Sequence, residues 1–250
     1  MTTTVACAAL NRDLAQYVLR AATFTDPGDY RYCGVLVREG VAYATNRYKA
    51  CAVKMPDGVP DGYYGLDAIR AMRKLRVKDG IQSIPLSRND FPEAVPPLFD
   101  DARGEGVAGL AVLTARFRSD RQFDRALNLL SQLDQGDIVV EIPLSGKMAI
   151  RPRRGESNPF VDSAKPWVLD AVYDVSGTWN DEYVAPIANP AFLADVLRLV
   201  GPEHRIYVRG PFNAMCFEPE YEWKGVRALL MGMKSDAPNV DWNGKLIARC

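Results

Sequence analysis

Four short amphipathic helices, separated by strand-like runs, constrain the fold of this 250-residue chain more than any other feature. The clearest begins at Asn189, a suitable N-cap, and has Pro190 at its first helical position and Gly201 after its last turn. Apolar side chains recur along it at helical spacing and predict a buried face: Phe192, Leu193, Val196, Leu197 and Val200. Such a helix needs a sheet or another helix to cover that face.

The other three helices are predicted over residues 11–22, 67–76 and 119–133. Asn11 can cap the first of them, and Ser119 with Gln122 forms a capping-box pattern for the third. Their apolar stripes are Leu14, Tyr17, Val18 and Ala21, then Ile69, Met72 and Leu75, then Phe123, Ala126, Leu127 and Leu130.

Strand-like runs fill the spaces between the helices. They are predicted over 35–37, 41–43, 51–53, 138–142, 148–150, 205–209, 214–217 and 226–231, with turns at Glu39-Gly40 and Ser145-Gly146. The order strand, helix, several strands recurs along the chain, which predicts an α+β protein with two similar domains. A small, charged, glycine-rich segment at 100–109 is the best linker candidate. We therefore expect domains at 1–105 and 106–234, with 235–250 as a loose tail.

Composition gives no argument for an enzyme, a metal site or a membrane protein. The cysteines (Cys7, Cys33, Cys51, Cys216 and Cys250) form no CxxC pair, so reduced thiols and no zinc site are expected. The one histidine, His204, follows Gly201-Pro202 in a predicted turn and is expected to be solvated. There is no phosphate-binding glycine loop, so no cofactor is expected. Without an apolar span or signal-peptide pattern, the chain is predicted to be cytoplasmic.

Three segments together resemble the beta-subunit sliding clamps of bacterial DNA polymerase III. The first, YATNRYKA at 43–50, is similar to an ATDG-containing strand and turn of that family, with Asn46 in place of Asp and Arg47 in place of Gly. The second is DFPE at 90–93 followed by PPLF at 96–99, which looks like a crossing between clamp domains. The third, 183–234, follows the last strand–helix–strand unit and ends in Met231-Gly232-Met233, where the family has MPM.

This resemblance implies a clamp fold, with two helices on the inner face of each domain and antiparallel sheets outside. It implies a processivity factor, not an enzyme, that encircles duplex DNA and is handled by a clamp loader. The family's pocket for peptides of the replicative polymerase corresponds to Thr45, Arg47, Tyr48, Lys49, Ala50, Pro97, Leu230, Met231 and Met233. The family's chains have three domains, whereas two are predicted here, as in the two-domain clamps of bacteriophages, archaea and eukaryotes. A bacteriophage source is the interpretation that this size favours.

Basic side chains recur on the predicted helices opposite the apolar stripes, which suits a surface facing DNA. The expected set is Arg12, Arg20, Arg70, Arg73, Lys74, Arg76, Lys78, Arg118, Arg121, Arg125 and Arg198. The whole chain nevertheless has 31 basic and 31 acidic residues and no net charge. A ring that slides must not grip phosphates tightly, so a neutral total is compatible with this hypothesis.

The helix count also predicts an assembly. Twelve helices, each about 10 Å wide, would line a circumference of roughly 120 Å and leave a bore of roughly 28 Å, enough for a duplex about 20 Å across. Eight helices would leave only roughly 15 Å. Four helices per chain therefore predict a homotrimer closed by head-to-tail contacts. The alternative is an adaptor or transcription-coupling protein that has the clamp fold but forms no ring.

Overall fold

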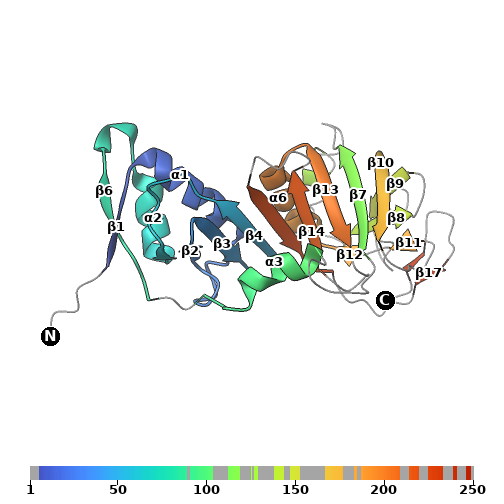
Figure 1. Ribbon diagram of the computed structural model, residues 1–250, viewed down its shortest axis with the longest axis horizontal. Helices are drawn as coiled ribbons and strands as arrows, with labels where there is room; N and C mark the ends of the chain where they lie inside the picture. The colour runs from blue at the N-terminus through green and yellow to red at the C-terminus, as the bar shows by residue number, and fades with distance from the viewer. Residues whose placement is uncertain are drawn as a thin grey trace. The chain divides into compact units, whose positions relative to one another are not determined.

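A computed structural model of the chain describes residues 6–88, 91–103, 112–118, 125, 127–128, 138–143, 147–152, 167–176, 183–184, 187–208, 214–219, 225–232, 239–240 and 246–248 (Figure 1). It divides into two compact units. Unit 1 is Met1–Leu98 with Trp223–Arg227, and unit 2 is Phe99–Glu222 with Ala228–Cys250. Within the described ranges, every helix is too short or too polar to cross a bilayer.

Unit 1 packs two helices against a four-stranded antiparallel sheet in the order β4-β3-β2-β5. A separate two-stranded sheet pairs β1 with β6. The elements are β1 (Cys7–Leu10), α1 (Arg12–Ala21), η1 (Ala22–Phe24), β2 (Val35–Arg38), β3 (Val41–Thr45), β4 (Lys49–Lys54), β5 (Gly62–Tyr64), α2 (Leu66–Lys74), η2 (Val77–Asp79) and β6 (Gln82–Pro85). The hairpin between β2 and β3 turns at Glu39 and Gly40, both at positive φ (52° and 71°), as predicted.

Unit 2 is built around a larger antiparallel sheet. Its strands run in the order β11-β8-β9-β10-β7-β13-β14-β15, with β12 also pairing with β8. They are β7 (Val112–Arg118), β8 (Ile138–Pro143), β9 (Lys147–Pro152), β10 (Trp167–Ser176), β11 (Tyr183–Val184), β12 (Ile187–Ala188), β13 (Glu203–Val208), β14 (Met215–Pro219) and β15 (Val226–Leu230). The first two residues of β15 belong to unit 1. Helix α6 (Pro190–Val200) packs on β13 and β14. A last hairpin pairs β16 (Asn239–Val240) with β17 (Leu246–Ala248).

Local signals explain the two helices with the best-defined starts. The Asn11 side chain accepts a hydrogen bond from the Leu14 N–H of α1 at 2.9 Å. Asn189 does the same for the N–H groups of Ala191 and Phe192, and Pro190 begins α6 as predicted. The stripe of α1 was wrong in one member, because Tyr17 is 44% exposed. An aromatic side chain at the margin of the stripe keeps its hydroxyl in water.

Four other expectations need correction. The first residues of the predicted linker are helical, because α3 (Val95–Arg103) continues through them from a start near Pro96 and Pro97. His204 is only 1% exposed, since β13 begins at Glu203 and alternates burial, which places His204 on the inward face with Ile206 and Val208. Residues 235–250 contain the β16–β17 hairpin, so they are not simply a loose tail. Several strands were also missed, β1, β5, β6, β7, β10, β11 and β12.

Candidate DNA-facing and partner-binding surfaces

Unit 1 presents a basic face on two helices that pack against each other, α1 and α2. All five of their predicted DNA-facing side chains belong to exposed residues: Arg12, Arg20, Arg70, Arg73 and Lys74. Their positions oppose the buried residues Val18 and Met72, so burying the apolar stripe turns the cations outward. Asp67 offsets part of this charge through an ion pair with Arg70 at 3.4 Å, but both side chains are well exposed and the pair is weak.

The remaining predicted cations have different environments. Arg76 and Lys78 are exposed around η2, which follows α2. Arg118 lies at the end of strand β7 and pairs in register with Glu203, so its assignment to the third helix was wrong. The alternating pattern of the preceding residues continues the strand through it. Arg125 is helical and exposed, and Leu127 and Asn128 are helical as well. Arg121 and most of the predicted helix 119–133 lie outside the described residues.

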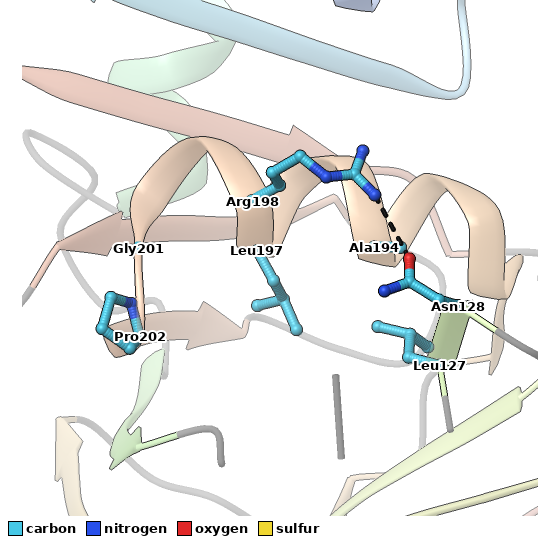
Figure 2. Close-up of a pocket in the computed structure, with 7 residues that line it drawn as sticks. All are labelled: Leu127, Asn128, Ala194, Leu197, Arg198, Gly201 and Pro202. Carbon is cyan, nitrogen blue, oxygen red and sulfur yellow. Dashed lines mark hydrogen bonds between the residues drawn. The ribbon is translucent and has the colours of Figure 1, made fainter. Parts of the chain in front are cut away.

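Arg198 on α6 links that helix to the helical segment around residue 128. Its guanidinium donates to Asp195 at 2.8 Å and to the Asn128 amide oxygen at 3.2 Å. Figure 2 shows the hydrogen bond between Arg198 and Asn128. Both residues line a cavity of about 250 Å³, whose other lining residues are Leu127, Ala194, Leu197, Gly201 and Pro202. Because Arg198 is engaged by a carboxylate, it offers DNA less free charge than Arg73 or Lys74.

The first of the three segments that resemble the clamp family, residues 43–50, contains a tight turn between β3 and β4. The Asn46 side chain accepts hydrogen bonds from the N–H groups of Tyr48 (3.1 Å) and Lys49 (2.9 Å). The Thr45 hydroxyl donates to the Lys49 carbonyl at 2.9 Å and accepts from the Arg47 N–H at 3.1 Å. Side-chain oxygens therefore satisfy the backbone donors of the turn, a role that Thr and Asn perform well. Tyr48 is held at the tip and is 54% exposed.

Arg47 is the unusual residue of this turn, because it is a non-glycine residue at φ 79°. Its guanidinium forms an ion pair with Asp29 and lies 5.0 Å from the centroid of the Tyr32 ring. Arg31 also pairs with Asp29, at 3.3 Å, and hydrogen bonding from Arg31 holds the pKa of the Asp29 carboxyl below its usual value. These contacts hold the Arg47 side chain in place although its backbone is in the left-handed region.

Residues 29–32 were not among the predicted site residues. They lie in a turn closed by hydrogen bonds from the N–H of Asp26 to the Tyr32 carbonyl (2.8 Å) and from the N–H of Tyr32 to the Asp29 carbonyl (2.9 Å). Tyr30 is 74% exposed beside them. The turn-forming residues Asp26, Pro27 and Gly28 were a usable signal for a loop, but nothing in the sequence indicated that this loop meets Arg47.

Lys49 was predicted to line the peptide pocket, but its side chain is turned inward. It is only 5% exposed, its ammonium donates to the Thr23 carbonyl at 2.9 Å, and it lies 4.8 Å from the Phe24 ring centroid. A hydrogen bond and an aromatic face can hold a lysine that is turned inward. Ala50 next to it is buried in β4. Of the predicted pocket residues in this turn, Arg47 and Tyr48 are therefore the ones that reach solvent.

The other predicted pocket residues belong to different elements. Pro97 is an exposed residue of α3. Leu230 is buried at the end of β15, where it pairs in register with Met215, and Met231 directly after it is 38% exposed. Met233 lies outside the described residues. An exposed methionine following a buried strand end is suited to contact a partner, because its side chain is flexible and polarisable.

The described residues offer no obvious chemistry. Burial raises the pKa of the Cys51 thiol to about 12, so this cysteine is inert at neutral pH. Burial and the nearby Asp61 raise the pKa of the Tyr64 hydroxyl to about 12. In the part of the chain that the structure describes, no three His, Cys, Asp or Glu side chains form a group that could hold a metal ion.

Comparison with known proteins identifies the fold of this chain. No protein-family model and no curated protein matches the sequence. Solved structures do match, among them the DNA polymerase III beta chain of Streptococcus pneumoniae TIGR4, with a TM-score of 0.65 and 14% identity over 94% of this chain and 66% of that one. The beta subunit from Streptococcus pyogenes follows with a TM-score of 0.64 and 13% identity over 94% and 67%.

The DNA polymerase sliding clamp of Caulobacter crescentus also matches, with a TM-score of 0.61 and 16% identity over 94% of this chain and 68% of that one. The chain thus spans about two thirds of the length of these proteins. The predicted α+β architecture of helices and antiparallel sheets is confirmed, and the chain has the fold of DNA sliding clamps.

Proposed function

We propose that this protein is a sliding clamp: a non-enzymatic processivity factor that encircles duplex DNA without reading its sequence and tethers a replicative DNA polymerase. The observation that carries the proposal is the clamp fold combined with a basic face on neighbouring helices α1 and α2. Exposed Arg and Lys on helices can contact phosphates weakly, and salt screens such contacts, so the protein can move along DNA.

We infer that the chain forms a homotrimeric, head-to-tail ring with two clamp domains per copy, at 1–105 and 106–234. Three copies with four inner helices each would supply the twelve helices that a bore of roughly 28 Å requires. A clamp loader would open the ring, and the proposed setting is a cytoplasmic, bacteriophage-encoded replisome. The two-unit division of the chain supports the domain count.

We further propose that polymerase peptides bind at the Thr45–Ala50 turn together with Pro97, Leu230, Met231 and Met233. Exposed Tyr48 and Met231 are the side chains best suited to accept apolar anchors, since aromatic residues and methionine are enriched at interfaces. Arg47 carries a charge already paired with Asp29, so a peptide acid would have to share it. Lys49 contributes by anchoring the turn through the hydrogen bond from its ammonium group to the Thr23 carbonyl.

Light scattering in solution tests the proposed assembly. We expect a mass of about three times the 27.7 kDa of one chain at micromolar concentration. A monomer at that concentration would instead favour the clamp-fold adaptor or transcription-coupling protein, and a stable dimer would contradict the twelve-helix geometry.

A further inference from the structure

The two units of this chain differ in the strands that follow helices α2 and α6. In unit 2, α6 is followed by β13, β14 and β15, and β13 pairs with β7 on one edge and with β14 on the other. In unit 1, α2 is followed by β6, which pairs with β1 as β13 pairs with β7. Among the described residues, no strand pairs with the second edge of β6 itself (Figure 1). Just past its end, on the same side, the N–H of Ser87 donates to the Tyr63 carbonyl of β5 at 2.9 Å, so the open part of the edge is confined to β6. In the described part of unit 1, β6 therefore has no counterpart of the hairpin that β14 and β15 form beside β13.

The open edge of β6 can accept a strand. The N–H of Leu86 donates to the Ala6 carbonyl, so the backbone groups of Ile84 and Gln82 also face β1 and those of Ser83 face away from it. Pro85 has no N–H to offer on that side, which limits pairing to a short segment. Ile81, directly before the strand, is 71% exposed and could cover an added strand. Exposed strand edges with adjoining apolar surface are sites of strand addition.

The C-terminal segment supplies a hairpin of suitable size. β16 and β17 pair with each other and, in the described part of the chain, with no other strand. They contain two and three residues, which suits the four residues of β6. The sequence between them includes Asn243-Gly244, a dipeptide that strongly favours hairpin turns. An isolated two-stranded hairpin is marginally stable in water, so it would gain by joining another sheet.

Charge favours a second copy of the chain as the source of this hairpin. Unit 1 has 15 Lys and Arg residues against 10 Asp and Glu, a formal charge of +5. Unit 2, which contains the hairpin, has 16 against 21, a formal charge of −5. Joining unit 2 of one copy to unit 1 of the next brings opposite charges together, whereas joining like units repels them. Such contacts are head-to-tail and can close a ring.

We propose that the C-terminal hairpin of each copy adds to the open edge of β6 in the next copy and so joins the subunits. This inference rests on the proposed ring and names the segment that closes it. It gives a role to the hairpin that follows β15.

Two full-length variants separate the two sides of the joint. Ser83→Pro removes the N–H that faces the open edge and leaves the hairpin intact. Ile247→Pro disrupts the hairpin and leaves the β6 edge intact. Each variant alone should lose assembly and run at 27.7 kDa by light scattering, with the far-UV circular dichroism of the wild type. An equimolar mixture should form a heterodimer of about twice that mass and nothing larger, because only one productive joint remains.

Asp236→Pro, in the tail before the hairpin, is the matched control and should assemble as the wild type does. If the wild type assembles and both variants assemble equally well, the hairpin inference is overturned while the ring proposal stands. A mixture that stays monomeric also overturns it, provided that both variants are folded. A wild-type chain that is monomeric at micromolar concentration overturns the ring and this inference together.

Discussion

Replacing Arg47 by glycine and by alanine measures the backbone strain in the turn between β3 and β4. Arg47 sits at φ 79°, a conformation that costs a non-glycine residue about 1–2 kcal/mol. Both substitutions remove the Asp29 ion pair and the contact with the Tyr32 ring equally. Glycine relieves the strain and alanine retains it. Glycine also gives the unfolded chain more freedom, which costs the glycine variant about 0.4–1 kcal/mol. The alanine variant should therefore be less stable than the glycine variant by a net difference of about 1 kcal/mol.

Thermal unfolding followed by circular dichroism measures this difference. For a unit of about 100 residues, 1 kcal/mol shifts the melting temperature by roughly 4–8 °C, so the two variants should be readily separated. Urea unfolding of the same pair gives an independent value through the shift of the midpoint at constant slope. Equal stabilities, or a more stable alanine variant, would show that the residue does not hold a left-handed conformation.

Three further predictions concern separate parts of the molecule. Burial raises the pKa of the Cys51 thiol from 9.0 to about 12, so the thiol ionises first in the unfolded chain and the free energy of unfolding falls as pH rises from about 9 toward 12. In urea titrations, Cys51→Ala should reduce this pH slope by up to about 1.4 kcal/mol per pH unit, and an unchanged slope would contradict the prediction. Replacing Arg70, Arg73 and Lys74 by Glu should leave the free energy of unfolding nearly unchanged but impair processivity in primer extension with the cognate polymerase. The control Arg38→Glu, at an exposed position of β2, should not impair it, and equal extension by the two variants would exclude α2 from the DNA-facing surface. We expect the wild type to bind a polymerase peptide with apolar anchors at a micromolar dissociation constant or weaker. Replacing Met231 and Met233 by Asp should abolish this binding in calorimetry and leave assembly intact, and equal affinity for wild type and variant would place the partner site elsewhere.

Local signals made some of this fold predictable. Asn11, Asn189 and Pro190 act on backbone groups within one turn of themselves, so the starts of α1 and α6 could be predicted from neighbouring residues alone. The Glu39-Gly40 turn was predicted for the same reason. Helix α3 was missed because Pro96 and Pro97 were interpreted only as part of a crossing between domains, although proline is tolerated in the first turn of a helix.

Contacts between distant segments could not be predicted in the same way. His204 is buried because β7 and β14 flank its strand, and that pairing depends on residues far away along the chain. Lys49 turns inward because Thr23 and Phe24 happen to lie beneath it. The role of Asp29 beside Arg47 depends on a contact across 18 positions. Motif resemblance placed the Thr45–Ala50 turn, but only the folded structure shows which of its side chains are exposed.

Retention on circular DNA tests the proposed function most directly. The chain would be assembled at high concentration with a nicked circular duplex, separated from free protein by gel filtration, and then treated with an enzyme that cuts the duplex once. A ring held by topology should stay on the circle at high salt and be lost after linearisation, because weak phosphate contacts alone do not survive salt. Equal retention on circular and linear DNA, or no retention on either, would contradict a ring that encircles the duplex.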